Sequence, residues 1–187
     1  MKKFLGKTLL AIAGWKLDIR VPVKTIPKCV LIAAPHTTNW DFYYAVSAFW
    51  ALDIPMKFFI KDSWTKPWYG VFIKALGGIG INRSQRSDMV GFGANQLKIN
   101  DHLYLLNTPE GSRSYAEKWK TGFYYIALEA NVPILLAYAD YQKKMTGIGK
   151  VIDNVQNKTK EEVLQEIEAY YFDIKGKFPE NYNPKIF

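Results

Sequence analysis

The chain has 187 residues, enough for one domain, and its 49% of hydrophobic residues can bury a substantial core, which excludes an intrinsically disordered protein. Its 25 basic and 17 acidic residues give a net charge of +8. This charge either keeps the protein soluble or favours an anionic partner, such as nucleic acid, an anionic bilayer or a phosphorylated substrate. A single cysteine, Cys29, excludes an intrachain disulfide and favours a reducing compartment, and with only two histidines the sequence predicts no metal site.

The N-terminal 20 residues have the pattern of an amphipathic helix. At about 100° per residue, Lys3, Lys7 and Asp18 share one face. The opposite face carries Phe4, Leu5, Leu9, Ile12 and Trp15. We therefore expect residues 1–20 to form a helix in the membrane interface and residues 21–187 to form the main domain. A terminal helix packed on the domain fits the pattern equally well, whereas a cleaved signal peptide fits less well because Lys7 interrupts the apolar stretch.

No apolar run reaches the roughly 18 to 20 residues that are needed to cross a bilayer. Together with the basic amphipathic helix and the single cysteine, this predicts a protein without a transmembrane segment, bound peripherally to the cytoplasmic face of a membrane.

Further along the chain, apolar runs of strand length alternate with longer segments of helical character. Strands are expected at 29–34, 56–60, 79–82, 102–106 and 133–139, with one or two more over 141–152. Helices are expected at 39–52, from Pro67 to Gly77, and at 88–99, 122–130 and 159–172. This alternation predicts an α/β fold with a mixed, largely parallel central sheet flanked by helices. In such folds, functional side chains gather at the carboxyl ends of the strands.

His36 follows the first buried strand, and Asp41 stands at the start of the next helix. In a continuous helix the two would lie about 140° apart, but a loop at His36 lets the chain fold back so that they meet. Asp41 could then orient the imidazole and leave one ring nitrogen free as a base. Because the chain has no Gly-x-Ser-x-Gly elbow and Cys29 lies within a strand, the pair favours direct activation of a substrate hydroxyl. The alternative is that His36 only caps a loop.

A Glu-Gly-Ser-Arg turn at 110–113 follows another expected strand. Gly111 permits a tight turn, and Arg113 can bind a phosphate or carboxylate with its forked guanidinium. An ordinary surface turn is the alternative. The glycine-rich strand that ends at Arg83 lacks the spacing of a nucleotide-binding loop.

The order of these segments resembles the glycerolipid acyltransferase family, which contains the 1-acylglycerol-3-phosphate acyltransferases. The resemblance covers about residues 30 to 152. Four ordered blocks carry it: the HX4D motif from His36 to Asp41, the strand ending in Arg83, the turn at 110–113, and Val-Pro-Ile at 132–134. The segment 118–122 is also similar to a Lys-Gly element of the family.

The resemblance implies a role for each matched residue. His36 would take the proton from an acceptor hydroxyl, and Asp41 would orient and stabilise the imidazole. The activated oxygen would attack the thioester of acyl-CoA or acyl carrier protein, which are co-substrates, so that no cofactor is required. The residues implied in acceptor binding are Arg83, Glu110, Gly111, Ser112 and Arg113, with Lys61 as a looser match. The implied partners are an anionic membrane surface, a lysolipid and the acyl donor, with no nucleic acid.

Three positions depart from the family pattern. Gly80 and Asn82 stand where Phe and Asp are common, and Ser112 replaces the commoner Thr. The expected activity is O-acyl transfer to 1-acylglycerol-3-phosphate, but these departures leave another acceptor open, such as a lyso-aminolipid. A catalytically silent membrane-binding module remains an alternative, against which the His36 and Asp41 pair speaks. A basic nucleic-acid binder that stacks bases on its aromatic residues is a further alternative.

Overall fold

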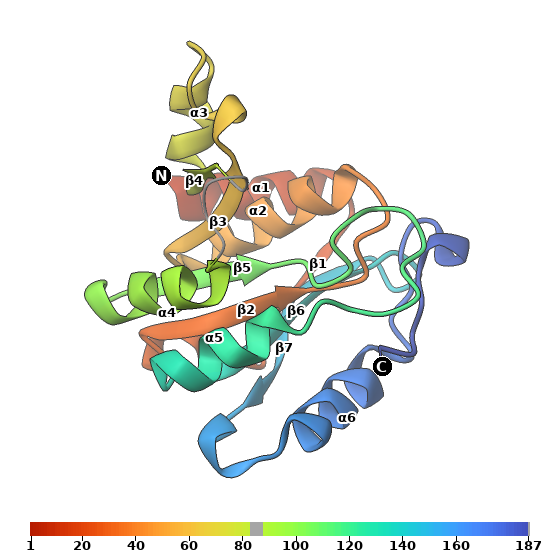
Figure 1. Ribbon diagram of the computed structural model, residues 1–187. Helices are drawn as coiled ribbons and strands as arrows, with labels where there is room; N and C mark the ends of the chain where they lie inside the picture. The colour runs from red at the N-terminus through yellow and green to blue at the C-terminus, as the bar shows by residue number, and fades with distance from the viewer. Residues whose placement is uncertain (83–87, 187) are drawn as a thin grey trace.

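The computed structural model describes residues 1–82 and 88–186 (Figure 1). Arg83, which was expected to hold a phosphate, therefore lies outside the described residues. The strands are β1 (Lys16–Asp18), β2 (Lys28–Ala33), β3 (Met56–Lys61), β4 (Gly78–Ile81), β5 (Leu103–Asn107), β6 (Ile134–Asp140) and β7 (Met145–Ile152). The helices are α1 (Lys2–Ile12), α2 (Trp40–Leu52), α3 (Gly70–Ala75), α4 (Met89–Ile99), α5 (Gly122–Ala130) and α6 (Lys160–Tyr171).

The strands form one seven-stranded sheet in the order β1-β7-β6-β2-β5-β3-β4. All neighbouring pairs are parallel except β6 and β7, which run antiparallel. This arrangement confirms the expected α/β fold with a mixed, largely parallel sheet. Residues 141–152 contribute the single strand β7, because residues 141–144 form the turn that joins it to β6.

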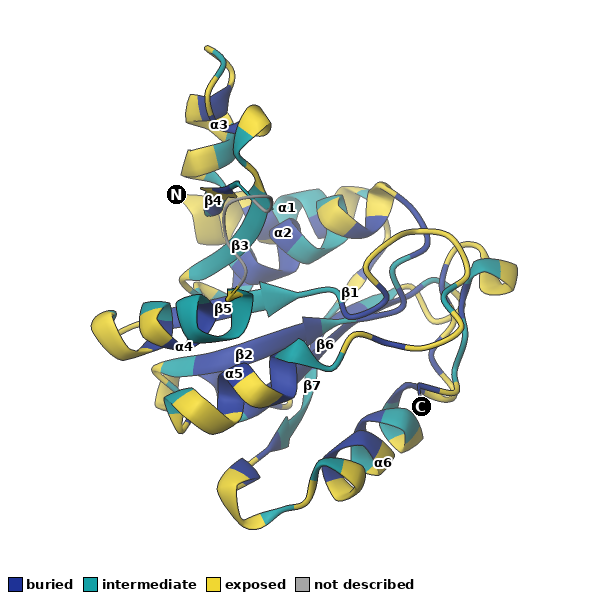
Figure 2. Cartoon of the chain, in the orientation of Figure 1, coloured by how far each residue is buried: buried dark blue, intermediate teal, exposed yellow. Residues whose placement is uncertain are grey.

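Helices cover both faces of the sheet (Figures 1 and 2). Cys29 and Leu31 of β2 point into a core that they share with α1 and α2. Val30 and Ile32 point the other way, into a core that they share with α4, α5 and α6. All four side chains are fully buried, so the continuous apolar run contributes side chains to the hydrophobic cores on both faces of the sheet.

Local sequence signals explain several helix boundaries. Thr159 and Glu162 form the expected capping box at the start of α6. Asp88 is the N-cap residue of α4, and its side chain accepts a hydrogen bond from the Gly91 N–H. The helix expected from Pro67 begins only at Gly70, because Pro67 belongs to the turn before the helix, where its carbonyl accepts the N–H of Gly70.

α1 is a terminal helix that packs along α2 (Figure 1). Gly6 and Leu10 form the buried side of α1, and Trp15, just after the helix, is also buried. Phe4 and Ile12 remain 78% and 81% exposed. The helix expected over residues 1–20 therefore ends at Ile12, because residues 16–18 join the sheet as β1. Most of the expected apolar face is exposed, and the helix packs on the domain through a neighbouring face. In the described parts of the chain, no helix is long and apolar enough to cross a bilayer.

Candidate active site

A cavity of about 720 Å³ lies at the carboxyl ends of β2, β3 and β5. Most of its wall is apolar and comes from α2, β3, α3 and β5: Phe42, Ala45, Phe49, Phe58, Phe59, Ile60, Ile73 and Leu106. Its polar part consists mainly of His36, Asn39, Asp41, Asn107, Thr108, Arg113 and Lys120. A cavity of this size, with apolar walls and a few polar groups at one end, suits a ligand that has a polar head and an apolar tail.

The loop between β2 and α2 brings His36 and Asp41 together, as expected from their spacing. His36 leaves the end of β2, and Asp41 lies in the first turn of α2. The Nδ1 atom of His36 is 3.3 Å from Oδ2 of Asp41. Asp41 is buried, while His36 is partly exposed to the cavity that both residues line. With Nδ1 facing Asp41, Nε2 is the nitrogen left for a substrate.

The Asp41 carboxylate is fixed by three further hydrogen bonds. Oδ2 accepts from the backbone N–H groups of Thr37, at 2.7 Å, and Thr38, at 2.9 Å. Oδ1 accepts from the hydroxyl of Tyr141, at 2.8 Å. Burial raises the pKa of Tyr141, which keeps its hydroxyl protonated and therefore a donor. These bonds hold Asp41 in one orientation beside His36 and support its assignment as the orienting group.

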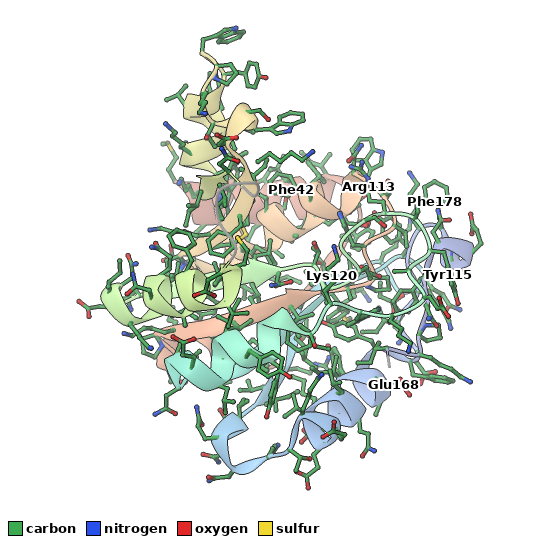
Figure 3. The ribbon with its side chains drawn as sticks, in the orientation of Figure 1. Phe42, Arg113, Tyr115, Lys120, Glu168 and Phe178 are labelled. Carbon is green, nitrogen blue, oxygen red and sulfur yellow. The ribbon has the colours of Figure 1, made fainter. Side chains whose placement is uncertain are left out.

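Two cationic side chains stand at the polar end of the cavity. Arg113 and Lys120 both line it, and Figure 3 shows them on the loop between β5 and α5. Arg113 donates a hydrogen bond to the side-chain oxygen of Asn39, at the start of α2. Gly111 has φ +73°, and a Cβ there would lie 2.8 Å from Nζ of Lys120, so a glycine lets the lysine approach the turn. The pair gives this end of the cavity an affinity for anions.

Comparison with known proteins identifies the family of this chain. A family model described as Acyltransferase matches residues 20–137, which include both the His36–Asp41 loop and the turn at 110–113. The chain belongs to the acyltransferase family. Its fold is similar to that of PlsC, the 1-acyl-sn-glycerophosphate (LPA) acyltransferase from Thermotoga maritima, with a TM-score of 0.63 and 17% identity. The similarity covers 90% of this chain and 74% of that one. A comparison with curated proteins gives no match.

In this acyltransferase, Glu110 contacts the loop that carries His36 and does not line the cavity. Its carboxylate accepts the backbone N–H of His36, with Oε2 at 2.8 Å and Oε1 at 3.2 Å. Burial raises the pKa of Glu110 to about 8, and the nearby charge of Asp41 contributes in the same direction. Glu110 was expected to bind or position the acceptor; its contacts in the structure are those of a residue that positions the His36 loop.

The raised pKa of Glu110 predicts that the acyltransferase loses stability as the pH rises. The folded protein holds this proton up to about pH 8, whereas the unfolded chain releases it near the ordinary pKa of 4.5, so folding is most favoured below that pH. The contribution declines between these two pH values by at most about 1.4 kcal/mol per pH unit. Glu110→Gln should remove this decline, which urea unfolding of both proteins at pH 5.5 and 8 would measure.

A matched control for this measurement is Glu117→Gln, an exposed residue of the same loop, which should follow the wild type. The free energies of unfolding of the wild type and Glu110→Gln are compared at each pH, so that the titration of all other groups cancels. If the difference between them is the same at both pH values, Glu110 does not titrate in this range.

Two further residues expected to bind the acceptor do not line the cavity. Ser112 is exposed, and its hydroxyl donates to the carbonyl oxygen of Ser114 at 3.2 Å. Lys61 is exposed at the end of β3, although the preceding residue, Ile60, is part of the cavity wall. Lys120 and Tyr141 were not predicted as site residues. Lys120 lies in the segment that resembles the Lys-Gly element of the family, whereas the sequence around Tyr141 carries no comparable signal.

Among residues 1–82 and 88–186, no group of three or more His, Cys, Asp and Glu side chains could hold a metal ion. Cys29 lies fully buried within β2, and burial raises the pKa of its thiol well above the usual value. A buried neutral thiol is a poor nucleophile. Cys29 is therefore not placed to act as a nucleophile beside His36.

Proposed function

We propose that this acyltransferase moves a fatty acyl group from the thioester of acyl-CoA or acyl carrier protein to the hydroxyl of a lysolipid, with 1-acylglycerol-3-phosphate as the leading acceptor. The observation that carries the proposal is the position of the His36 and Asp41 pair. Both residues line a 720 Å³ cavity whose wall also contains apolar side chains and the cations Arg113 and Lys120. The name of PlsC, a 1-acyl-sn-glycerophosphate acyltransferase with a similar fold, supports the same acceptor class.

In the proposed reaction, Nε2 of His36 takes the proton of the acceptor hydroxyl while the oxygen attacks the thioester carbonyl carbon. The new C–O bond forms an ester, the C–S bond breaks, and the departing sulfur receives the proton from the imidazolium. Asp41, held by Thr37, Thr38 and Tyr141, stabilises the transient positive charge on the ring. No acyl-enzyme is formed, because the attacking oxygen belongs to the acceptor.

We expect the apolar side chains of the cavity to bind an acyl chain and its cationic side chains to bind the phosphate of the acceptor. The aromatic and aliphatic side chains of α2, β3 and β5 would surround an acyl chain, which gains free energy by leaving water. Arg113 and Lys120 would bind the phosphate of the acceptor, with the guanidinium providing two parallel hydrogen bonds. A phosphate at this position would place the nearby acceptor hydroxyl close to His36.

The proposal is tested by measuring thiol release from long-chain acyl-CoA and acyl carrier protein in the presence of lysolipids in mixed micelles. The panel contains 1-acylglycerol-3-phosphate, other lysophospholipids and a lyso-aminolipid. Release that depends on the phosphorylated acceptor is expected. Thiol release with the lyso-aminolipid alone would identify a lyso-aminolipid, and not 1-acylglycerol-3-phosphate, as the acceptor. If a folded protein binds vesicles but releases no thiol with any acceptor, a catalytically silent membrane-binding module is favoured.

Arg113→Ala is expected to raise the KM for a phosphorylated acceptor by roughly 10- to 100-fold, because a hydrogen bond to a charged group is lost. The KM for the acyl donor should change little. Lys118→Ala is the matched control: it removes an exposed cation of the same loop that does not line the cavity. Steady-state kinetics with each substrate varied in turn would check this. A change confined to the acyl donor would contradict the role of Arg113.

The proposed site of action is the cytoplasmic face of an anionic membrane. The exposed part of α1 supports this, because Phe4, Leu5 and Ile12 face solvent and lysines at positions 2, 3 and 7 accompany them. Apolar side chains beside lysines are typical of helices that lie in the interface of anionic bilayers. The net charge of +8 adds a general attraction to such a surface.

A further inference from the structure

Residues 62–75, which we call the aromatic arm, stand away from the rest of the fold (Figure 1). The arm consists of the short 3-10 helix Asp62–Trp64, a turn, and α3. Figure 2 shows much of its surface as exposed. Its large exposed side chains are Trp64 (51%), Trp68 (83%), Tyr69 (39%), Val71 (62%) and Phe72 (62%). A patch of this composition on a folded domain indicates an interaction surface.

The exposure belongs to an ordered structure and not to a loosely packed end. Thr65 is buried at the base of the arm, and its hydroxyl donates to the carbonyl oxygen of Asp62 at 3.0 Å. Gly70 and Gly80 both pack against Thr65 so closely that a Cβ on either would overlap it. The Gly70 N–H also donates to the Pro67 carbonyl at 2.8 Å. The fold therefore holds the arm in place with its aromatic side chains turned outward.

The arm is continuous with the cavity of the active site. Trp64 and Ile73 belong to the arm and also line the cavity. Trp68 and Phe72, in contrast, do not line it. The arm therefore contributes side chains both to the exposed surface and to the wall of the cavity that contains His36.

We propose that the aromatic arm docks the protein on an anionic lipid bilayer and places the mouth of the cavity on the membrane surface. Trp and Tyr favour the membrane interface, where an apolar ring and a polar edge are both accommodated. Exposed lysines lie next to the arm at 61 and within it at 66 and 74, where Lys66 pairs with Asp62, and anionic headgroups attract such cations. A bilayer fits this surface better than an acidic protein does, because the most exposed side chain of the arm is the indole of Trp68.

This inference deepens the proposed function, since it rests on a lipid being the ligand of the cavity, but its test does not depend on turnover. The full chain is mixed with sedimenting vesicles of phosphatidylcholine, with or without phosphatidylglycerol, and the bound fraction is measured. Trp68→Ser with Phe72→Ser is the test variant, and the single change Trp68→Ala is a second one. Ile99→Ser with Phe172→Ser is the matched control, because these residues are 65% and 58% exposed at α4 and α6.

The double arm variant is expected to bind the anionic vesicles at least about tenfold more weakly than the wild type, because two large apolar side chains no longer enter the lipid. The matched control should bind like the wild type, and circular dichroism should show the same thermal midpoint for all proteins. The double variant Phe4→Ser with Ile12→Ser measures how much α1 contributes to the affinity for vesicles.

Unchanged vesicle binding by both arm variants would overturn the proposal, and so would an equal loss in the matched control. Loss of affinity for acyl carrier protein with vesicle binding intact would also overturn it and would assign the arm to the acyl donor. If the wild type transfers no acyl group but the arm variants bind vesicles more weakly than it does, the membrane-docking role of the arm is supported and the proposed reaction is refuted.

Discussion

Replacing His36 with alanine is expected to lower kcat by about 10²- to 10⁴-fold, the range typical of losing a general base. The ring lines the cavity, and its Nδ1 atom faces Asp41, so that Nε2 remains for the acceptor hydroxyl. Alanine offers no proton acceptor at this place. The fold should be retained, because the ring is partly exposed and the backbone N–H of residue 36 can still donate to Glu110.

The other histidine provides the control for this experiment. His102 lies in an exposed turn before β5, far along the chain from the catalytic loop, so His102→Ala should leave kcat unchanged. Initial rates of thiol release at saturating acceptor, together with thermal unfolding, would separate lost chemistry from lost structure. If His36→Ala keeps most of its activity while folded, another group removes the proton.

The sequence predicted the sheet because its central strands carry their own signal. In β2, Cys29 to Ile32 are apolar without interruption, and the structure buries them on both faces. Such a run has few other ways to fold, and the alternation with helices then determines an α/β domain. The start of α3 was placed too early, because Pro67 is favourable in a first helical turn but here belongs to the turn before the helix.

The contact between His36 and Asp41 could be predicted because the two residues are close in sequence. His36 and Asp41 are separated by a single loop, so local geometry alone limits where they lie. Tyr141 could not be predicted, since it meets Asp41 only after β6 and β7 have joined the sheet, 100 residues away in sequence. Contacts between residues far apart in sequence depend on the order of the strands in the sheet, which cannot be predicted from a single sequence.

Burial explains the other differences between the expected site and the structure. Glu110 and Arg113 belong to one turn, yet Glu110 points into the protein and Arg113 lines the cavity. The pattern of α1 has the same limit: periodicity identifies an apolar face but not how much of it a neighbouring helix covers. In the structure α1 packs on α2 through Gly6 and Leu10, which lie outside the expected face, while Phe4 and Ile12 of that face are exposed.

Asp41→Asn is expected to lower kcat by about 10²- to 10⁴-fold, by analogy with the loss of the orienting carboxylate in Ser-His-Asp enzymes. Asparagine has the same shape but no charge, so it cannot stabilise an imidazolium. The N–H groups of Thr37 and Thr38, which bind Oδ2 of Asp41, hold the amide oxygen of asparagine at that place, so Nδ1 of His36 then faces a neutral oxygen. Because Thr37 and Thr38 then donate to a neutral oxygen, the free energy of unfolding should fall by about 1–3 kcal/mol.

The control for this prediction lies at the other end of the same helix. Asp53 ends α2 with φ 59°, a left-handed conformation in which asparagine is tolerated as well as aspartate, so Asp53→Asn should change neither kcat nor stability. Tyr141→Phe separates the two roles of Asp41: it removes the hydrogen bond to Oδ1 but keeps the charge. A kcat near the wild-type value for Tyr141→Phe with a large loss for Asp41→Asn would show that the charge matters most. Equal losses in both variants would show that the orientation of Asp41 matters as much as its charge.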